Sequence, residues 1–90
     1  MARAVVDPGE LRRFAHDLKR FNNDLRSQMS GLHGRMVELG QSWRDQEHTK
    51  FMEEFEQTMK VLVRFVDSSE KHIPFLLRKA QRVEEYLQQR

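Results

Sequence analysis

The chain has 90 residues, of which 33% are charged and 38% are apolar, and its formal net charge is only +2. This length predicts one domain, residues 1–90, and the small net charge gives no sign of a general polyanion binder. The lack of cysteine excludes a disulfide framework and a thiolate zinc site.

A long amphipathic helix is predicted over residues 8–39. Asp7 and Pro8 favour a helix start, because Asp can cap free N–H groups and Pro fits the first helical position. Apolar residues then recur every three or four positions, which is the helical period. They are Leu11, Phe14, Leu18, Phe21, Leu25, Met29, Leu32, Met36 and Leu39. Gly40 is well placed to end this helix.

The following residues predict a short turn, 40–43, and a second helix over residues 44–88. We expect Ser42 to cap this helix, with Asp45 three residues later in a capping-box arrangement. The second apolar series keeps its phase across Pro74, which favours one helix with a kink over two helices. Its members are Phe51, Phe55, Met59, Leu62, Val66, Ser69, Ile73, Leu76, Ala80, Val83 and Leu87.

Two amphipathic helices joined by a short turn predict an all-α fold, an antiparallel two-helix hairpin. A single hairpin has one layer of contact and leaves much of both apolar series uncovered. Two hairpins are therefore expected to dimerise into a four-helix bundle, as a homodimer or as a heterodimer with a related hairpin. The residues expected at the dimer interface are Leu18, Phe21, Leu25, Phe51, Phe55, Leu62 and Val66.

Charge is distributed unevenly along the chain. Residues 43–70 carry four Lys/Arg and seven Asp/Glu, whereas residues 71–90 carry five and two. Opposite charges across a bundle favour one orientation of two copies. Ordinary solvated helix faces give the same pattern, so both interpretations stay open.

No residue pattern indicates catalysis or metal binding. The four histidines form no His-x-x-x-His pair, and the sequence has no Gly-rich phosphate loop. We predict no enzyme activity, no catalytic residue, no cofactor and no metal. The N-terminus lacks the apolar segment of a cleaved Sec signal, and no apolar run is long enough for a stable membrane insertion. Arg78, Lys79 and Arg82 form only a weak candidate for nucleic-acid binding.

Trp43 at the predicted turn has two interpretations. It can act as a hydrophobic plug that covers the end of the hairpin. It can also be presented to a partner, because Trp is enriched among the residues that contribute most to interfaces.

These features resemble the WXG family of small type VII secretion substrates, which have about a hundred residues, a Trp-Xaa-Gly turn between two helices and an aromatic residue eight positions after the Trp. The matching residues here are Trp43-Arg44-Asp45 and Phe51, with Asp45 in the position of the glycine. The family's C-terminal export signal places an acidic residue four positions after a tyrosine.

Four positions after Tyr86 this chain has Arg90, a basic residue where the family's export signal has an acidic one. The resemblance implies a non-enzymatic secreted factor or a helper for secretion of a partner, with recognition through Trp43, Asp45 and Tyr86. It also implies an FtsK/SpoIIIE-type secretion ATPase as a partner. Synthesis in the cytoplasm would be followed by secretion without a cleaved signal peptide. A cytosolic helical adaptor is the alternative, followed by a small nucleic-acid-associated bundle.

Overall fold

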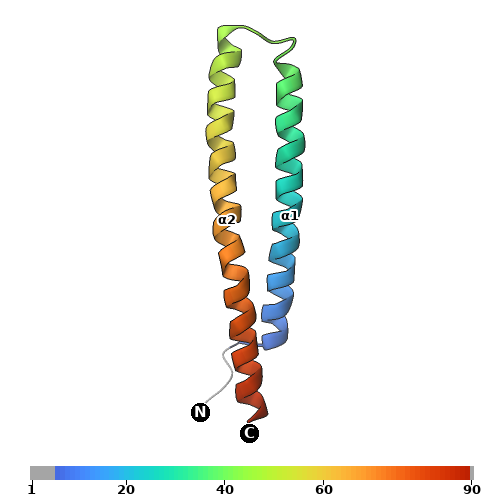
Figure 1. Ribbon diagram of the computed structural model, residues 1–90, viewed down its shortest axis with the longest axis vertical. Helices are drawn as coiled ribbons and strands as arrows, with labels where there is room; N and C mark the ends of the chain where they lie inside the picture. Colours follow the sequence, from blue (N-terminus) through green and yellow to red (C-terminus); the bar gives the residue numbers. More distant parts are fainter. Residues whose placement is uncertain (1–5, 90) are drawn as a thin grey trace.

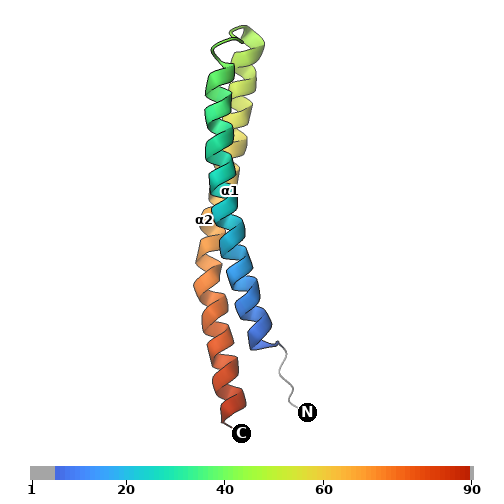
Figure 2. The same ribbon diagram turned by 90° about the vertical axis from the view of Figure 1, so that its right-hand side faces the viewer.

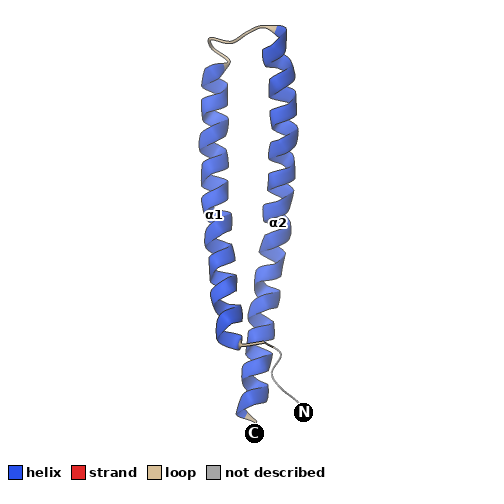
Figure 3. Ribbon diagram, turned by 180° about the vertical axis from the view of Figure 1, so that it is seen from behind, coloured by secondary structure: helices blue, strands red, loops and turns tan. Residues whose placement is uncertain are grey.

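The computed structural model describes residues 6–89, which form two helices, α1 (Pro8–Leu39) and α2 (Gln46–Gln88). The helices run antiparallel and are joined by a turn at one end of a rod measuring 69 × 19 × 16 Å (Figures 1 and 3). The predicted all-α hairpin is confirmed. Below, "tip" means the end with the turn and "base" means the opposite end.

The ends of α1 are set by residues next to it in the sequence. The Asp7 carboxylate accepts a hydrogen bond of 2.8 Å from the Gly9 N–H, which satisfies one of the free donors of the first turn. At the other end, the Gly40 N–H donates to the carbonyls of Met36 and Val37, each at 3.2 Å. Asp7 and Gly40 thus act as the caps that the sequence predicts.

The start of α2 differs from the prediction by two residues. Asp45, not Ser42, is the capping residue, and its carboxylate accepts a 3.0 Å hydrogen bond from the His48 N–H. The Ser42 hydroxyl instead donates to the Leu39 carbonyl at 3.3 Å, so it serves the turn and is not free to cap α2. Pro74 lies inside α2, which continues through it as one helix.

The helices wind gently around each other. They are seen side by side at the tip in Figure 1, whereas in Figure 2, turned by 90°, they are seen side by side at the base. The core between them is narrow. Its buried apolar residues are Ala15, Met36, Val66 and Ala80. Val66, which the sequence assigned to the dimer interface, is only 2% exposed in the single hairpin and packs inside it.

A polar cluster at mid-length fixes the register of the two helices. Asn22 is fully buried, and its amide nitrogen donates to the Ser69 hydroxyl at 3.0 Å and to the Glu70 carboxylate at 3.3 Å. Arg26 donates to the same carboxylate at 2.8 Å. Sliding either helix would leave buried polar groups without partners, so the cluster holds Asn22 opposite Ser69.

Two ion pairs connect the helices and depend on ionised carboxylates. Hydrogen bonds from Arg26 and then Asn22 lower the pKa of Glu70 below its usual 4.5. A hydrogen bond from the Arg12 guanidinium lowers the pKa of Glu84 in the same way. Because both pKa values are lower in the folded state, each pair stabilises the hairpin above the unfolded-state pKa. That contribution is lost as the pH falls through the folded-state pKa.

We therefore expect the melting temperature to decrease as the pH falls below the usual glutamate value of 4.5. Glu70→Gln should lower the melting temperature at neutral pH and flatten this acid dependence. Glu53→Gln, at an exposed position outside both ion pairs, is the control and should keep the wild-type pH profile. Circular dichroism melts over an acid pH series test this, and an unchanged slope in Glu70→Gln would contradict it.

Candidate partner-binding surfaces

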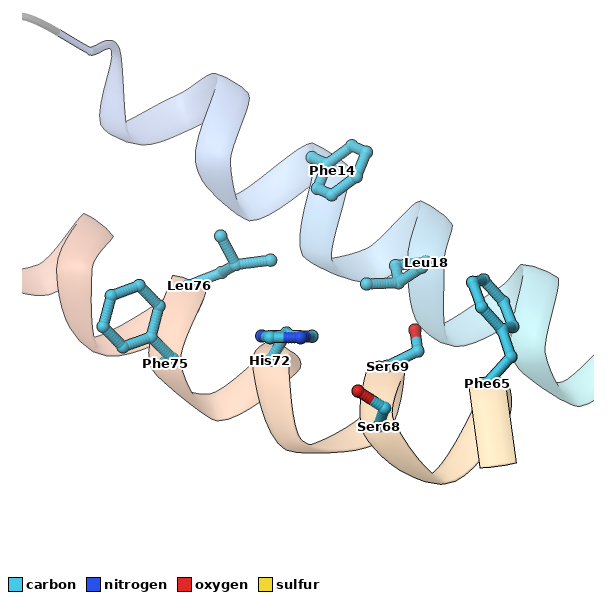
Figure 4. Close-up of a pocket in the computed structure, with 8 residues that line it drawn as sticks. All are labelled: Phe14, Leu18, Phe65, Ser68, Ser69, His72, Phe75 and Leu76. Carbon is cyan, nitrogen blue, oxygen red and sulfur yellow. The ribbon is translucent and has the colours of Figure 1, made fainter. Parts of the chain in front are cut away.

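On one side of the hairpin, beside the narrow core, apolar side chains of both helices line a series of solvent-accessible hollows. Near the base, an apolar groove of about 480 Å³ runs between the helices, and Leu18, His72 and Leu76 project into it (Figure 4). The complete lining is Phe14, Leu18, Phe65, Ser68, Ser69, His72, Phe75 and Leu76. The lining therefore combines side chains from the first half of α1 with side chains from the middle and the second half of α2.

Two smaller hollows continue toward the tip. The first has a volume of about 310 Å³ and includes Leu25, Met59 and Leu62. The second, about 150 Å³, includes Phe51 and Phe55. Leu32 and Arg35 line both hollows, so the two are continuous.

The groove and the hollows form one surface, which we call the apolar face. It comprises Phe14, Leu18, Phe21, Leu25, Leu32 and Leu39 of α1 and Phe51, Phe55, Leu62, Phe65, Phe75 and Leu76 of α2. Phe21 and Phe65 meet edge to face at 6.3 Å and join its two halves. Four of its phenylalanines, Phe14, Phe21, Phe65 and Phe75, are 48–56% exposed.

Six of the seven residues predicted for the dimer interface lie together on the apolar face. Val66 is the exception, because it is buried between the helices. The seven residues listed for the dimer interface do not include Phe65, Phe75 or His72, although the positions of Phe65 and His72 beside the apolar series already indicate an interface role for these two. Phe65 directly precedes Val66, and Phe75 and His72 lie next to members of the second apolar series. The sequence signal for these residues is that this surface of α2 extends beyond the strip that contacts α1.

The tip carries an aromatic cluster around Trp43. The Trp43 ring lies 5.1 Å from His48, edge to face, and 5.7 Å from Phe51, between ring centroids. Phe51 in turn lies 5.9 Å from Phe55, so the cluster runs into the apolar face. A Cβ at Gly40 would sit 3.4 Å from the His48 ring, which is ordinary van der Waals contact, so this ring lies close against the turn. Trp43 is half-buried, with part of the indole exposed.

Asp45 lies next to this cluster and its capping role predicts a graded response to substitution. Asp45→Ala should lower the free energy of unfolding by about 0.5–2 kcal/mol, whereas Asp45→Gly should lower it by only a few tenths. Urea unfolding measures both, with Asp67→Ala as a control at an exposed position inside α2. Equal losses for the alanine and glycine variants would show that the cap contributes little.

Tyr86 does not join Trp43 and Asp45 within one hairpin. It lies near the C-terminal end of α2, at the base, and is 56% exposed. The rod therefore separates the predicted recognition residues into a pair at the tip and one at the base (Figure 1). Arg90, which stands at the acidic position of the export signal, lies outside the described residues.

Among residues 6–89, no three His, Asp or Glu side chains group closely enough to hold a metal ion. No helix in the same range has the length and apolar character needed to cross a membrane.

Residues 5–86 match the sequence profile of WXG100, described as proteins of 100 residues with WXG. The chain belongs to the WXG100 family. Two crystal structures of the secreted protein ESXB from Bacillus anthracis strain Sterne are similar to it. The wild-type form is 28% identical with a TM-score of 0.77, covering 91% of this chain and 88% of ESXB. The selenomethionine-labelled form is 27% identical with a TM-score of 0.77, covering 96% and 98%. A search of curated proteins gave no match.

WXG100 proteins are non-enzymatic substrates of type VII secretion. The predicted family and the predicted lack of enzyme activity are thereby confirmed. This chain has Asp45 at the third position of the motif, and the Asp caps α2 through its carboxylate.

Proposed function

We propose that this chain leaves the cell through a type VII secretion system as a folded hairpin paired with a second hairpin. The pair forms a four-helix bundle and acts as a secreted factor or as a helper for a secreted partner. The observation that carries this proposal is the apolar face. Membership of WXG100 and similarity to ESXB, a secreted protein, support the proposed secretion route.

The exposure of the apolar face argues for a paired state. Four half-exposed phenylalanines and a groove of about 480 Å³ occupy one side of a hairpin that buries only a few apolar residues inside. Stable monomers rarely expose so continuous an apolar surface, because covering it removes unfavourable contact with water. A second amphipathic hairpin has the length and the apolar stripe to cover it.

The two ends of the rod supply the proposed recognition surfaces. Trp43 and Asp45 lie at the tip, and Tyr86 lies at the base. Antiparallel pairing would bring Trp43 of one hairpin beside Tyr86 of the other, creating a composite surface at each end of the bundle. An FtsK/SpoIIIE-type ATPase is the partner that we propose for this surface.

Fractionation of producing cells tests the route. We expect the full-length chain in the culture fluid of cells with an intact FtsK/SpoIIIE-type ATPase gene, and only in the cytosol after that gene is deleted. A cytosolic enzyme assayed in both fractions controls for lysis. Retention in the cytosol of intact cells would favour the alternative, a cytosolic adaptor, and would contradict the proposal.

A further inference from the structure

The end of α1 beside the turn is held to α2 less firmly than the rest of that helix. We propose that residues 31–39, which we call the tip segment, unwind and detach from α2 while the rest of the hairpin stays folded. The tip segment is the green end of α1 in Figure 1. Its opening uncovers aromatic side chains of α2. This inference concerns a single hairpin and does not depend on the proposed function.

Two glycines weaken the helix where the tip segment begins. Gly31 and Gly34 lie inside α1, and a Cβ on either would meet no atom of the described chain within 4 Å apart from the backbone of its own helix. Neither glycine is therefore needed to let another part of the hairpin approach closely. Each makes the helix less stable than alanine would, because glycine loses more backbone freedom when it becomes helical.

The polar contacts between the helices all lie outside the tip segment. Among residues 6–89, the side chains of α1 that form hydrogen bonds or ion pairs with α2 are Arg12, Asn22 and Arg26. Even the nearest of these, Arg26, precedes Gly31 by five residues. The tip segment is therefore held to α2 by apolar contact alone.

This apolar contact is small. Within the tip segment every residue except Met36 is exposed, and Met36 itself is only 4% exposed. Residues 8–30, by contrast, have a buried or half-buried residue in every helical turn. Parts of a protein with few buried contacts open locally at a lower free energy than the whole fold. The tip segment is thus the part of α1 that we expect to open first.

The tip segment forms one wall of the hollow nearest the turn. The residues that line this hollow of about 150 Å³ are Leu32, Arg35, Met36 and Leu39 of α1 and Phe51 and Phe55 of α2. All four α1 residues belong to the tip segment. Its opening therefore removes the whole α1 wall and uncovers the sides of the two phenylalanines that face it.

The aromatic rings at the tip are held in place without α1. Trp43 lies 5.7 Å from Phe51, and Phe51 lies 5.9 Å from Phe55, between ring centroids. These three residues belong to the turn and to α2. The open hairpin therefore presents a continuous row of three aromatic rings that the closed hairpin partly covers. Gly31 and Gly34 set how often this row is uncovered, because they lower the free energy of opening.

Hydrogen exchange of the full-length chain, resolved by residue with NMR, tests the proposal. The amide protons of Met36 and Val37 should exchange at least about tenfold faster than those of Leu18 and Asn22. Gly31→Ala should slow exchange in the tip segment about fivefold, the ratio that corresponds to the helix propensity of glycine against alanine. Adding Gly34→Ala should slow it by about the same factor again.

Two control variants separate local opening from unfolding of the whole hairpin. Ser27→Ala changes an exposed residue that stays helical when the tip segment opens, so exchange at Met36 and Val37 should not change. Glu70→Gln weakens the contacts with Asn22 and Arg26. It should therefore speed exchange at Asn22 and leave the tip segment unchanged.

Three results of the exchange experiment would overturn the proposal. The first is equal exchange rates in the tip segment and at Leu18. The second is an unchanged rate at Met36 in Gly31→Ala. The third is that Glu70→Gln speeds exchange at Met36 as much as at Asn22, since both amides would then open only when the whole hairpin unfolds.

Thiol labelling tests whether the hollow itself opens. The chain has no cysteine, so Met36→Cys and Val66→Cys each introduce a single thiol at a buried position. Val66 lies outside the tip segment and is the matched control. We expect a thiol reagent to label Met36→Cys at least about tenfold faster, and Gly31→Ala to slow that labelling about fivefold. Labelling of both thiols at the same rate would overturn the proposal.

Discussion

Replacing Leu62 with aspartate should separate the paired hairpins and unfold both helices. Leu62 lines the hollow at mid-length together with Leu25 and Met59, where a second hairpin would cover it. An unpaired carboxylate buried there costs several kcal/mol. The single hairpin has a small core and little stability to lose, so mass and helicity should decrease together. Leu25→Asp should have the same effect.

The control is Val63→Asp, one residue further along α2. Val63 is 47% exposed and is not part of the apolar face. It should keep the mass and circular dichroism spectrum of the wild type. If Leu62→Asp also kept both, the apolar face would not be the surface that pairs.

The second large effect is expected at Trp43. Trp43→Ala removes the contacts with His48 and Phe51. It should lower the free energy of unfolding by about 3 kcal/mol, the lower end for large buried truncations, since part of the indole is exposed. Trp43→Phe keeps a ring against both neighbours. It should therefore melt close to the wild type while export decreases sharply.

Thermal unfolding and export are measured on the same Trp43→Phe preparation and strain. If Trp43→Phe loses export with little change in melting temperature, Trp43 belongs to a surface that a partner recognises. A loss of melting temperature in proportion to the loss of export would mean that Trp43 serves only as a plug at the tip.

The two helices and their antiparallel arrangement could be predicted because the sequence signals for them are local. The three- and four-residue spacing defines each helix, and Asp7 and Gly40 mark the ends of α1 with adjacent hydrogen bonds. The start of α2 could not be placed as well. Ser42 and Asp45 both offer capping oxygens, and the contact of the Ser42 hydroxyl with the turn carbonyl decided between them.

The residues of the apolar face were harder to predict. A wide apolar series in the sequence does not show which of its residues will contact the other helix and which will remain exposed. Val66 turned inward and its neighbour Phe65 remained half-exposed. The contact of Asn22 with Ser69 joins residues far apart in the chain, so its register depends on both helices together.

The rod shape has a consequence for passage through a narrow opening. The Cα radius of gyration is 20.4 Å, whereas a compact domain of this length would have about 12 Å. Viewed end-on, however, the hairpin presents a cross-section of only 19 × 16 Å. Adding whole helical turns would lengthen the rod without widening it. A channel wide enough for the proposed pair, which is two such cross-sections side by side, would therefore also pass longer paired hairpins without unfolding them.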